Sequence, residues 1–535
     1  MTDLHDVDPA VAWGEPKAPL RPVIGTVDIP SMQAQETLRL DLTGDGHVAV
    51  FASPGYGKST FLQTLVMDLA RTHSPEHLHV YLLDFGTNGL LPLRGLPHVA
   101  DTVTLDDTQK TRKLVERIEV EIKRRKQLLS GYSVANLSMY ERASGEALPH
   151  VLLVVDGVEA LKGEASEEVL TTLMYGVARE GAGLGMHLAL STGRQTTLRG
   201  NVAANIKTQL ALKMNDDVEP VSIVGRTTLR VDDLPGRGLV HHGQPELFQA
   251  ALPTPGADML EIVDAIRAEA AGMDARWQGA RPEHIPVIPE TLELDDLLAR
   301  PGTARLVAEG TVPVGLDLDS VEPTGLAVSR QRRVLVLAED GESVGARIAL
   351  LWRAGSRAFA AGAFVIDDDD GNLRGLVRET RGGATTVHDT LDAALAELDL
   401  RGQAYEAARA AADPPSAAEF GRSLDRALVI VGDVSSVATQ LGEQRAAGLL
   451  RLISDGPQLG MPVLLGGRLG AAGKGPGDLA KATKDVTAGV VVGRIADQSV
   501  LRASNLPYKE PLLGPDGAWV VADGKAVPVK IPAPS

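Results

Sequence analysis

The sequence HVAVFASPGYGKST at residues 47–60 determines the expected fold class. Residues 48–51 are apolar and partly β-branched, as in a buried strand, and residues 52–57 form a glycine-bearing loop. Apolar residues then recur between positions 61 and 69 at the spacing of one helix face. A strand, a Gly-x-Gly-Lys-Ser loop and a helix in this order are typical of a phosphate-binding loop of the Walker A type, with Ala52 at the position of the first glycine.

This loop predicts which residues would bind a nucleotide. Gly55 and Gly57 would let the backbone curl until its amide groups face the β-phosphate, beside the positive end of the helix dipole. Lys58 would contact the β- and γ-phosphates, and the Ser59 hydroxyl would ligate Mg²⁺. Without a nucleotide, we expect the Lys58 side chain to lie in solvent. The predicted cofactors are ATP and Mg²⁺, and the predicted nucleotide-binding residues are Ala52, Ser53, Pro54, Gly55, Tyr56, Gly57, Lys58, Ser59 and Thr60.

A carboxylate at the end of a neighbouring strand is expected to complete the site. Asp156 follows the buried run 151–155 and fits the Walker B position, from which it would reach the Mg²⁺ held by the Ser59 hydroxyl. The next residue is Gly157, where a motor ATPase usually has a Glu that polarises the attacking water. ATP binding and ATP hydrolysis are therefore separate questions. Glu159 could supply that carboxylate, although a solvated loop charge is the favoured interpretation.

Thr192 follows the predicted strand 187–190 and is a candidate sensor of the γ-phosphate; a simple turn at the end of a strand is an equally good interpretation. The predicted catalytic residues are Lys58, Asp156 and Thr192, and the predicted metal ligands are Ser59 and Asp156. If the protein forms a ring, an arginine from a neighbouring copy could complete the site, and the candidates are Arg194, Arg226 and Arg237.

The order of strands returns in the second half of the chain. Residues 334–337, 364–367 and 428–431 repeat the pattern of 48–51, 82–84 and 152–155, at offsets that fall from about 286 to about 275. Strands that alternate with helices predict α/β domains with mainly parallel sheets. We therefore expect two tandem domains, at residues 1–275 and 311–535, joined by a linker at 276–310 that contains Pro282, Pro286 and Pro289.

The second copy lacks the phosphate-binding residues. Residues 338–345 (AEDGESVG) align with residues 52–59, which puts Val344 in place of the lysine and Gly345 in place of the hydroxyl. Three carboxylates stand where polyphosphate would lie: Glu339, Asp340 and Glu342. Gly432 is expected in register with the Walker B aspartate. We therefore expect a degenerate domain that does not bind ATP in the ordinary way and whose cleft is available to a protein partner.

Composition narrows the classes of partner. The 535 residues include 53 Lys plus Arg against 70 Asp plus Glu, a formal charge of −17, with 3% aromatic residues. This balance argues against nucleic-acid binding through bulk charge or base stacking. The basic run at 123–126 lies among glutamates and is interpreted as a solvated helix face with intrahelical ion pairs. The absence of Cys and of a long apolar run favours a cytoplasmic setting, with any membrane attachment supplied by another segment or chain.

Several longer stretches resemble one family. They are DIPSMQAQETL at 28–38, the run from FASPGYGKSTFLQTLVMDLA to PHVADTV at 51–103, IVGRTTLRVDDLPGRGLV at 223–240 and GQPELFQAALP at 243–253. These stretches closely resemble the second ATPase domain of the EssC/YukB/EccC proteins of type VII secretion, within the FtsK/SpoIIIE family. The resemblance is strong from about residue 23 to residue 289, and it is weaker but collinear to the C-terminus.

The resemblance implies two tandem RecA-like P-loop NTPase domains, the second degenerate, in which Lys58, Ser59 and Asp156 take the nucleotide roles. It also implies a membrane-tethered motor that moves WXG100-type proteins across the cytoplasmic membrane. Expected partners are therefore an upstream portion with membrane spans and a first ATPase domain, the secreted substrates, and further copies in a hexameric ring. The expected location is the cytoplasmic face of that membrane, and no nucleic acid is expected.

Two other functions compete with a secretion motor. An FtsK-like DNA translocase would have the same loop, but the net charge of −17 weighs against it. A scaffold that holds a nucleotide without hydrolysing it is favoured by Gly157. We expect weak or assembly-dependent ATPase activity in the first domain and none in the second, and phosphate release separates the motor from the scaffold.

Overall fold

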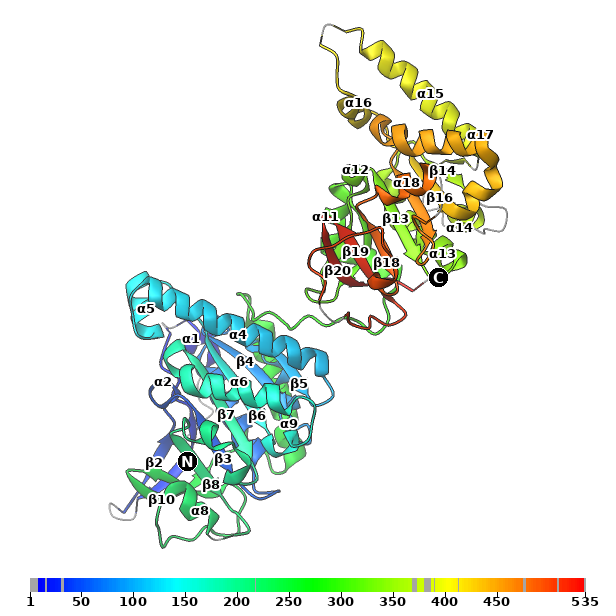
Figure 1. Ribbon diagram of the computed structural model, residues 1–535. Coiled ribbons are helices and arrows are strands. Elements are labelled where there is room, and N and C mark those ends of the chain that lie inside the picture. Colours follow the sequence, from blue (N-terminus) through cyan, green and yellow to red (C-terminus); the bar gives the residue numbers. More distant parts are fainter. Residues whose placement is uncertain are drawn as a thin grey trace. The chain divides into compact units, whose positions relative to one another are not determined.

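The computed structural model describes residues 8–14, 17–29, 33–216, 218–367, 373–379, 386–388, 390–411, 413–474, 478–507 and 510–533. The chain divides into two compact units, Met1–Ile285 and Pro286–Ser535 (Figure 1). Each unit contains one ten-stranded sheet. The expected fold class, α/β with mainly parallel sheets in two tandem domains, is confirmed.

The first sheet has the order β2-β1-β10-β9-β8-β3-β7-β6-β4-β5. The strands from β8 to β5 in this order run parallel, and those from β9 to β2 are antiparallel to their neighbours. The phosphate-binding loop therefore leaves the middle of the sheet, at the end of β3, with parallel strands on both sides. The strands are β1 Val23–Ile29, β2 Ala34–Arg39, β3 Val48–Phe51, β4 Leu78–Asp84, β5 Val99–Thr104, β6 His150–Asp156, β7 Met186–Thr192, β8 Thr208–Leu212, β9 Arg237–His242 and β10 Gln244–Ala250.

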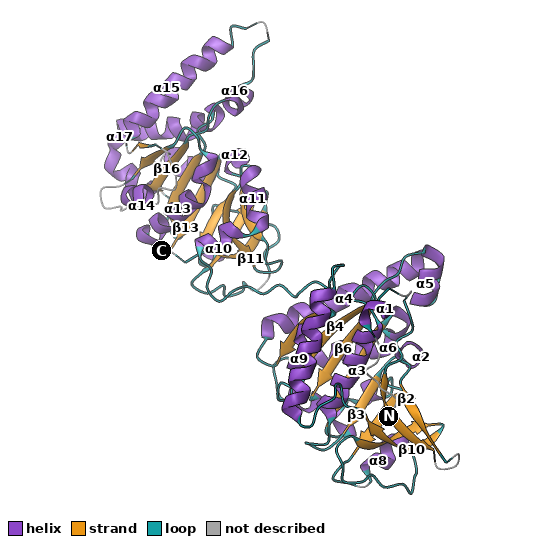
Figure 2. Cartoon of the chain, turned by 180° about the vertical axis from the view of Figure 1, so that it is seen from behind, coloured by secondary structure: helices purple, strands orange, loops and turns teal. Residues whose placement is uncertain are grey.

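Helices cover both faces of this sheet (Figures 1 and 2). Side chains alternate along a strand, so Val48 and Val50 of β3 pack in one apolar cluster with α3 and α9, while Ala49 and Phe51 pack in another with α4 and α6. Burial on both faces explains why the strands are apolar at nearly every position. The long helices are α3 Lys58–Thr72, α4 Thr108–Gly131, α5 Leu137–Ser144, α6 Glu167–Glu180 and α9 Met259–Arg276.

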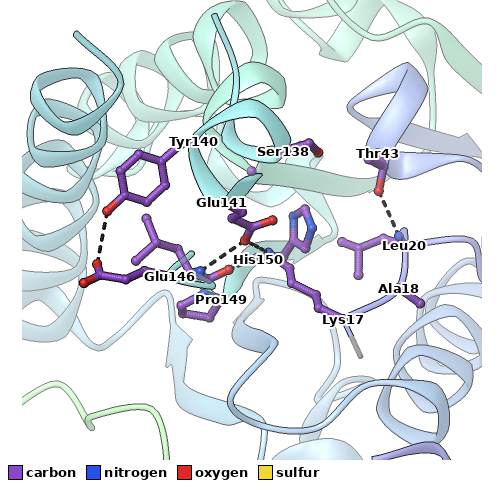
Figure 3. Close-up of polar contacts among 12 residues, drawn as sticks. Lys17, Ala18, Leu20, Thr43, Ser138, Tyr140, Glu141, Glu146, Pro149 and His150 are labelled. Carbon is purple, nitrogen blue, oxygen red and sulfur yellow. Dashed lines mark hydrogen bonds and ion pairs between the residues drawn. The ribbon is translucent and has the colours of Figure 1, made fainter. Parts of the chain in front are cut away.

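The segment that precedes β1 is tied to this unit by polar contacts (Figure 3). Lys17 Nζ donates to Glu141 Oε1 at 2.5 Å and to the Leu148 carbonyl at 2.5 Å. Farther along, the Leu20 amide donates to the Thr43 hydroxyl at 2.8 Å. The Lys17 side chain is 9% exposed, so its charge depends on the Glu141 carboxylate for compensation.

The second sheet repeats the first strand for strand. Its order is β12-β11-β20-β19-β18-β13-β17-β16-β14-β15, so each strand occupies the place of the strand numbered ten lower. In both units the middle strand pairs in the same register: Val48 lies opposite Ala189, and Val334 lies opposite Leu464. The strands are β11 Val312–Asp317, β12 Pro323–Leu326, β13 Arg333–Ala338, β14 Ala363–Ile366, β15 Val387–His388, β16 Leu428–Asp433, β17 Val463–Arg468, β18 Gly489–Val492, β19 Gly517–Ala522 and β20 Lys525–Lys530.

Helices again cover both faces, with α13 and α14 in one apolar cluster and α15 and α17 in the other (Figure 2). The helices of this unit include α10 Leu294–Ala299, α11 Pro301–Ala308, α13 Gly341–Gly355, α14 Leu373–Glu379, α15 Leu391–Ala408, α16 Ala417–Ser423, α17 Val434–Asp455 and α18 Asp478–Lys484. Helices α10 and α11 fall within the stretch predicted as a linker, and apolar residues of α10 pack with β11 and α13.

One buried arginine recurs in both units. Arg125 of α4 donates to Glu121 Oε1 at 2.6 Å, to the Leu184 carbonyl at 2.7 Å and to the Pro149 carbonyl at 2.8 Å. Its side chain is 1% exposed. The prediction that residues 123–126 form a solvated helix face is therefore wrong at Arg125, although Arg124 is half exposed and pairs with Glu121 as expected.

Arg401 of α15 makes the same contacts in the second unit. It donates to Glu397 Oε1 at 2.7 Å, to the Leu459 carbonyl at 3.0 Å and to the Asp425 carbonyl at 2.9 Å. In each unit the buried arginine thus binds one carboxylate and two backbone carbonyls, and the two sheets have the same strand order. Both observations indicate a duplicated scaffold, as the repeated sequence pattern predicted. Within the described residues, no helix is both long and apolar enough to cross a membrane.

Candidate functional site

The predicted nucleotide-binding residues lie between β3 and α3 or in the first turn of α3. Gly55 and Gly57 have φ values of +87° and +99°, a region that residues with a Cβ rarely adopt, so both glycines are required by the turn. The loop is fixed to the sheet because the Ala52 amide donates to the Thr192 carbonyl and the Ser53 amide to the Lys213 carbonyl. The result is a rigid turn that ends at the N-terminus of a buried helix, as a phosphate site requires.

Lys58 folds back over this loop. Its Nζ donates to the Ala52 carbonyl at 3.0 Å and lies 3.7 Å from Glu159 Oε1. The Lys58 side chain is 13% exposed, so the expectation that it lies in solvent is wrong. The ammonium group stays inside the loop because a backbone carbonyl and a carboxylate compensate its charge.

Ser59 and Asp156 meet at the start of α3. The Ser59 hydroxyl donates to Asp156 Oδ2 at 2.6 Å, and Asp156 is 2% exposed. The other carboxylate oxygen, Oδ1, accepts the hydroxyl of Ser191, whose oxygen also accepts the Gly157 amide at 3.0 Å. The structure therefore brings the two predicted metal ligands together. Ser191, which the sequence pattern did not indicate, holds the orientation of Asp156 from the next strand.

The Asp156 and Ser59 oxygens fit a Mg²⁺ ion. Both are hard oxygen donors, they converge from a strand end and a helix start, and Mg²⁺ takes its remaining ligands from substrate phosphates and water. When bound there, the ion would neutralise phosphate charge and orient the phosphates. Gly89 closes the other side: a Cβ at this position would lie 2.7 Å from Ser59 Oγ and 3.0 Å from Asp156 Oδ2. Only glycine leaves room there.

Asp84 is a second carboxylate at this edge, and the sequence pattern assigned it no role. It ends β4 directly opposite Asp156 in the parallel pair, and it is 3% exposed. Its Oδ2 accepts the Leu90 amide at 2.8 Å, which anchors the loop that carries Gly89. Burial raises the pKa of the Asp84 carboxyl, and the nearby Asp156 carboxylate raises it further. In the sequence, Asp84 and Asp156 each stand at the end of an apolar run, and this shared position is the signal that could have indicated Asp84.

Thr192 is fully buried at the end of β7, and among the described residues its hydroxyl has no hydrogen-bond partner. Its contact with the loop is through its carbonyl, which accepts the Ala52 amide. A role for Thr192 as a γ-phosphate sensor stays a prediction. Of the arginine-finger candidates, Arg237 pairs with Asp28 at 2.6 Å, whereas Arg194 is 74% exposed.

The corresponding loop in the second unit is a helix. Helix α13 begins at Gly341, and Asp340 caps it by accepting the Ser343 amide at 2.8 Å. The turn that would present amides to a phosphate is therefore absent from this described segment. Val344, in place of the lysine, is 1% exposed and packs against the sheet, where a Cβ on Gly466 would lie 2.6 Å from Val344 Cγ1.

The strand that corresponds to β6 has an acid at its end after all. A register shift in β16 places Val431 opposite Leu465 but Asp433, not Gly432, opposite Gly466. Our expectation that Gly432 stands in register with Asp156 is therefore wrong, because a bulge absorbs one residue. Among the described residues, the Asp433 carboxylate pairs with a cation: its Oδ2 accepts Arg468 Nε at 2.6 Å, and its Oδ1 accepts the Ser435 amide at 3.1 Å.

Comparison with known proteins agrees with this geometry. Residues 12–237 match the model of the FtsK/SpoIIIE family. A type VII secretion system protein EssC from Staphylococcus aureus (strain NCTC 8325 / PS 47) is 33% identical over 345 residues, which are 63% of this chain and 23% of EssC. The chain therefore spans about a quarter of the length of that relative.

Solved structures extend the likeness to both units. ATPases 2 and 3 of EssC from Geobacillus thermodenitrificans have a TM-score of 0.82 and 26% identity, with 96% of each chain covered. ATPases 2 and 3 of Thermomonospora curvata EccC, solved in complex with a signal sequence peptide, have the same fold with a TM-score of 0.51, 24% identity and coverage of 96% and 93%. The first unit is therefore similar to the FtsK/SpoIIIE family over residues 12–237, and the chain as a whole is similar to ATPases 2 and 3 of EssC.

Proposed function

We propose that the first unit binds ATP with Mg²⁺ and that the chain works as part of a type VII secretion ATPase. The observation that carries this proposal is the Walker A lysine and hydroxyl assembled with Asp156: Lys58 folded over the loop, and Ser59 Oγ 2.6 Å from Asp156 Oδ2. On nucleotide binding, Lys58 would exchange the Ala52 carbonyl for the phosphates. The family likeness supports the cellular role.

The proposed partners follow from the relatives. An upstream portion with membrane spans and a first ATPase domain would hold this chain at the cytoplasmic face of the membrane. Further copies would complete a hexameric ring, and WXG100-type proteins would be the exported substrates. The relative from Thermomonospora curvata is a complex with a signal sequence peptide. By analogy, we propose that the second unit here receives the C-terminal tail of such a substrate, and no nucleic acid is part of the proposal.

The nucleotide proposal is tested by titration of the full chain with Mg·ATP. We expect one ATP per chain and a loss of affinity of at least about 100-fold in Lys58→Ala, because two charge-assisted phosphate contacts are removed. The matched control is Val344→Ala, the same position in the second unit, which should leave ATP affinity unchanged. Two bound nucleotides per chain, or equal affinity in Lys58→Ala, would contradict the proposal.

The peptide proposal is tested by photo-crosslinking. A WXG100-type C-terminal peptide with a photoreactive residue is incubated with the full chain, and the crosslinked positions are identified by mass spectrometry. We expect crosslinks within residues 286–535 that unlabelled peptide removes by competition. Crosslinks confined to residues 8–285 would contradict the assignment of the peptide to the second unit.

A nucleotide-bound scaffold is the second candidate function, and Gly157 favours it. In this case ATP would hold the first unit to its neighbours without turnover. The two functions share the binding result and differ in phosphate release, which is measured on the same samples.

A further inference from the structure

We propose that Glu159 is the catalytic carboxylate that activates the attacking water in the first unit. This inference rests on the proposed ATP binding and adds the residue that hydrolysis needs. The loop position next to the Walker B aspartate, where a glutamate is usual, is occupied by Gly157. Glu159 lies at the phosphate-binding loop instead, where it pairs with Lys58.

The first step is that a side chain has no place at position 157. Gly157 has φ +75°, in the left-handed region that favours glycine. A Cβ there would lie 3.1 Å from the Gly86 amide nitrogen and 3.2 Å from Gly86 Cα, so the backbone that follows β4 would have to move. Position 157 is therefore glycine for a steric reason, and the carboxylate has to come from elsewhere.

The second step is the turn that follows. A short 3-10 helix, η3 Val158–Leu161, begins directly after Gly157 and carries Glu159 back toward the loop. Glu159 Oε1 lies 3.7 Å from Lys58 Nζ. It also lies beside Gly193, at the end of the next strand, where an added Cβ would be 3.4 Å from Glu159 Oε1. The carboxylate thus occupies the space between the Walker A lysine and the end of β7.

The third step is chemical. Lys58 is the group that reaches the γ-phosphate, so a carboxylate in contact with it lies at the γ end of the nucleotide. The Glu159 side chain is 40% exposed, which leaves it free to release Lys58 and to accept a water. Glu159 then takes a proton from that water as its oxygen bonds to the γ-phosphorus and the bond from phosphorus to the ADP oxygen breaks. The products are ADP and inorganic phosphate, and the proton passes from Glu159 to solvent.

Asp84 is the other acid near the loop, and its contacts suit a different role. Its Oδ2 accepts the Leu90 amide, and it lies opposite Asp156, on the metal side of the site. Asp84 therefore positions the loop that carries Gly89. We therefore assign to Glu159, and not to Asp84, the role of activating the attacking water.

The experiment uses the full chain, with ATP affinity and phosphate release measured on the same preparation of each variant. We expect wild-type turnover to be slow and to fall at least about 100-fold in Glu159→Gln, as loss of a general base does. ATP affinity should stay the same or rise a few-fold, because Glu159 no longer competes for Lys58. Glu159→Asp should retain partial turnover. The matched control is Glu164→Gln, an exposed acid on the same connection, which should turn over at the wild-type rate.

Three results would overturn the inference. They are turnover in Glu159→Gln within a few-fold of wild type, a larger loss of turnover in Asp84→Asn than in Glu159→Gln, and a wild-type chain that binds Mg·ATP without releasing phosphate. The last result would leave the proposed nucleotide binding intact. A wild-type chain that does not bind ATP would instead refute the proposed function, so the two failures are distinguishable.

Discussion

The two units share a scaffold and diverge at the loop after the middle strand and at the end of the strand that carries Asp156 or Asp433. Arg125 and Arg401 make equivalent buried contacts, and the ten strands of each sheet follow the same order. At the end of the middle strand the units diverge: a glycine turn and an inward-folded Lys58 in the first, a capped helix and a buried Val344 in the second. The sheet and its helices therefore form without a phosphate site.

The phosphate site of the first unit requires unfavourable local features. The first unit holds Asp84 and Asp156 side by side at a buried strand edge, and it holds two glycines at positive φ. The second unit has an apolar side chain and a helix cap at the corresponding loop, and its buried Asp433 pairs with the half-exposed Arg468. The turn with two glycines at positive φ, which a phosphate site requires, therefore occurs at the end of the middle strand in the first unit and not at the corresponding described segment of the second.

The largest expected difference between the two units is the loss of stability at acidic pH. Burial lowers the pKa of His47 to about 4 and the pKa values of His98 and His187 to about 3, so these imidazoles are neutral in the folded first unit. In the unfolded chain they titrate near 6.5. Their contribution to stability is therefore complete above pH 6.5 and is lost as the pH falls toward 4 and then 3, on the order of 1–2 kcal/mol for each by pH 5.

The second unit lacks this sensitivity, since residues 286–535 contain one histidine, His388, which is exposed. Urea unfolding at pH 7 and pH 5, followed by mass-spectrometric labelling of peptides from each unit, measures the difference. We expect the free energy of unfolding to fall much more in the first unit. An equal loss in both units would mean that the buried histidines do not control acid stability.

Loss of the buried arginine should affect both units equally. Arg125→Met and Arg401→Met each remove a buried cation and leave two backbone carbonyls without a donor, so each should destabilise its own unit by about 3 kcal/mol. Urea unfolding measures this. The control is Arg124→Met, whose side chain is 48% exposed and should matter by less than about 0.5 kcal/mol. A large effect in one unit alone would show that the scaffold contact is not shared.

Removal of the acid at the strand end should lower ATP affinity when it is Asp156 of the first unit and not when it is Asp433 of the second. Asp156→Asn should weaken Mg²⁺-dependent ATP affinity at least about tenfold, because it removes a metal ligand that Ser191 holds in place. Asp433→Asn should leave ATP affinity unchanged, since its carboxylate pairs with Arg468. ATP titrations with and without Mg²⁺ give both numbers. A Mg²⁺ effect in Asp433→Asn would mean that the second unit also binds nucleotide.

The glycines of the loop should give effects of opposite sign. Gly55→Ala has free space around the new methyl group but forces φ +87° on a residue with a Cβ, which costs about 1 kcal/mol. Gly341 occupies the aligned position in the first turn of a helix, also in free space, so Gly341→Ala should stabilise by about 0.5 kcal/mol. Thermal melting of the two variants measures the difference. Destabilisation in both would contradict the helical state of residues 341–343.

Local patterns were enough for the fold and part of the site. The loop at 52–60 and Asp156 could be predicted, because a strand, a glycine turn and a helix are encoded by neighbouring residues. Ser191 could not, since its contact with Asp156 depends on how two strands pair across many intervening residues. Arg125 was misassigned for the same reason: its carbonyl partners come from segments distant in sequence, and a run of four basic residues does not show which one turns inward.

Two α/β domains, one with a complete phosphate-binding loop and one without, can be predicted from local patterns, because hydrophobic periodicity and glycine placement act over short distances. Which acids face the loop depends instead on the tertiary packing of the strands. The bulge in β16 shifts the pairing by one residue, so that Asp433 takes the place expected for Gly432. The turn after Gly157 brings Glu159, two residues farther on, to Lys58. Such shifts are set by packing of whole strands against one another, and no local pattern encodes them.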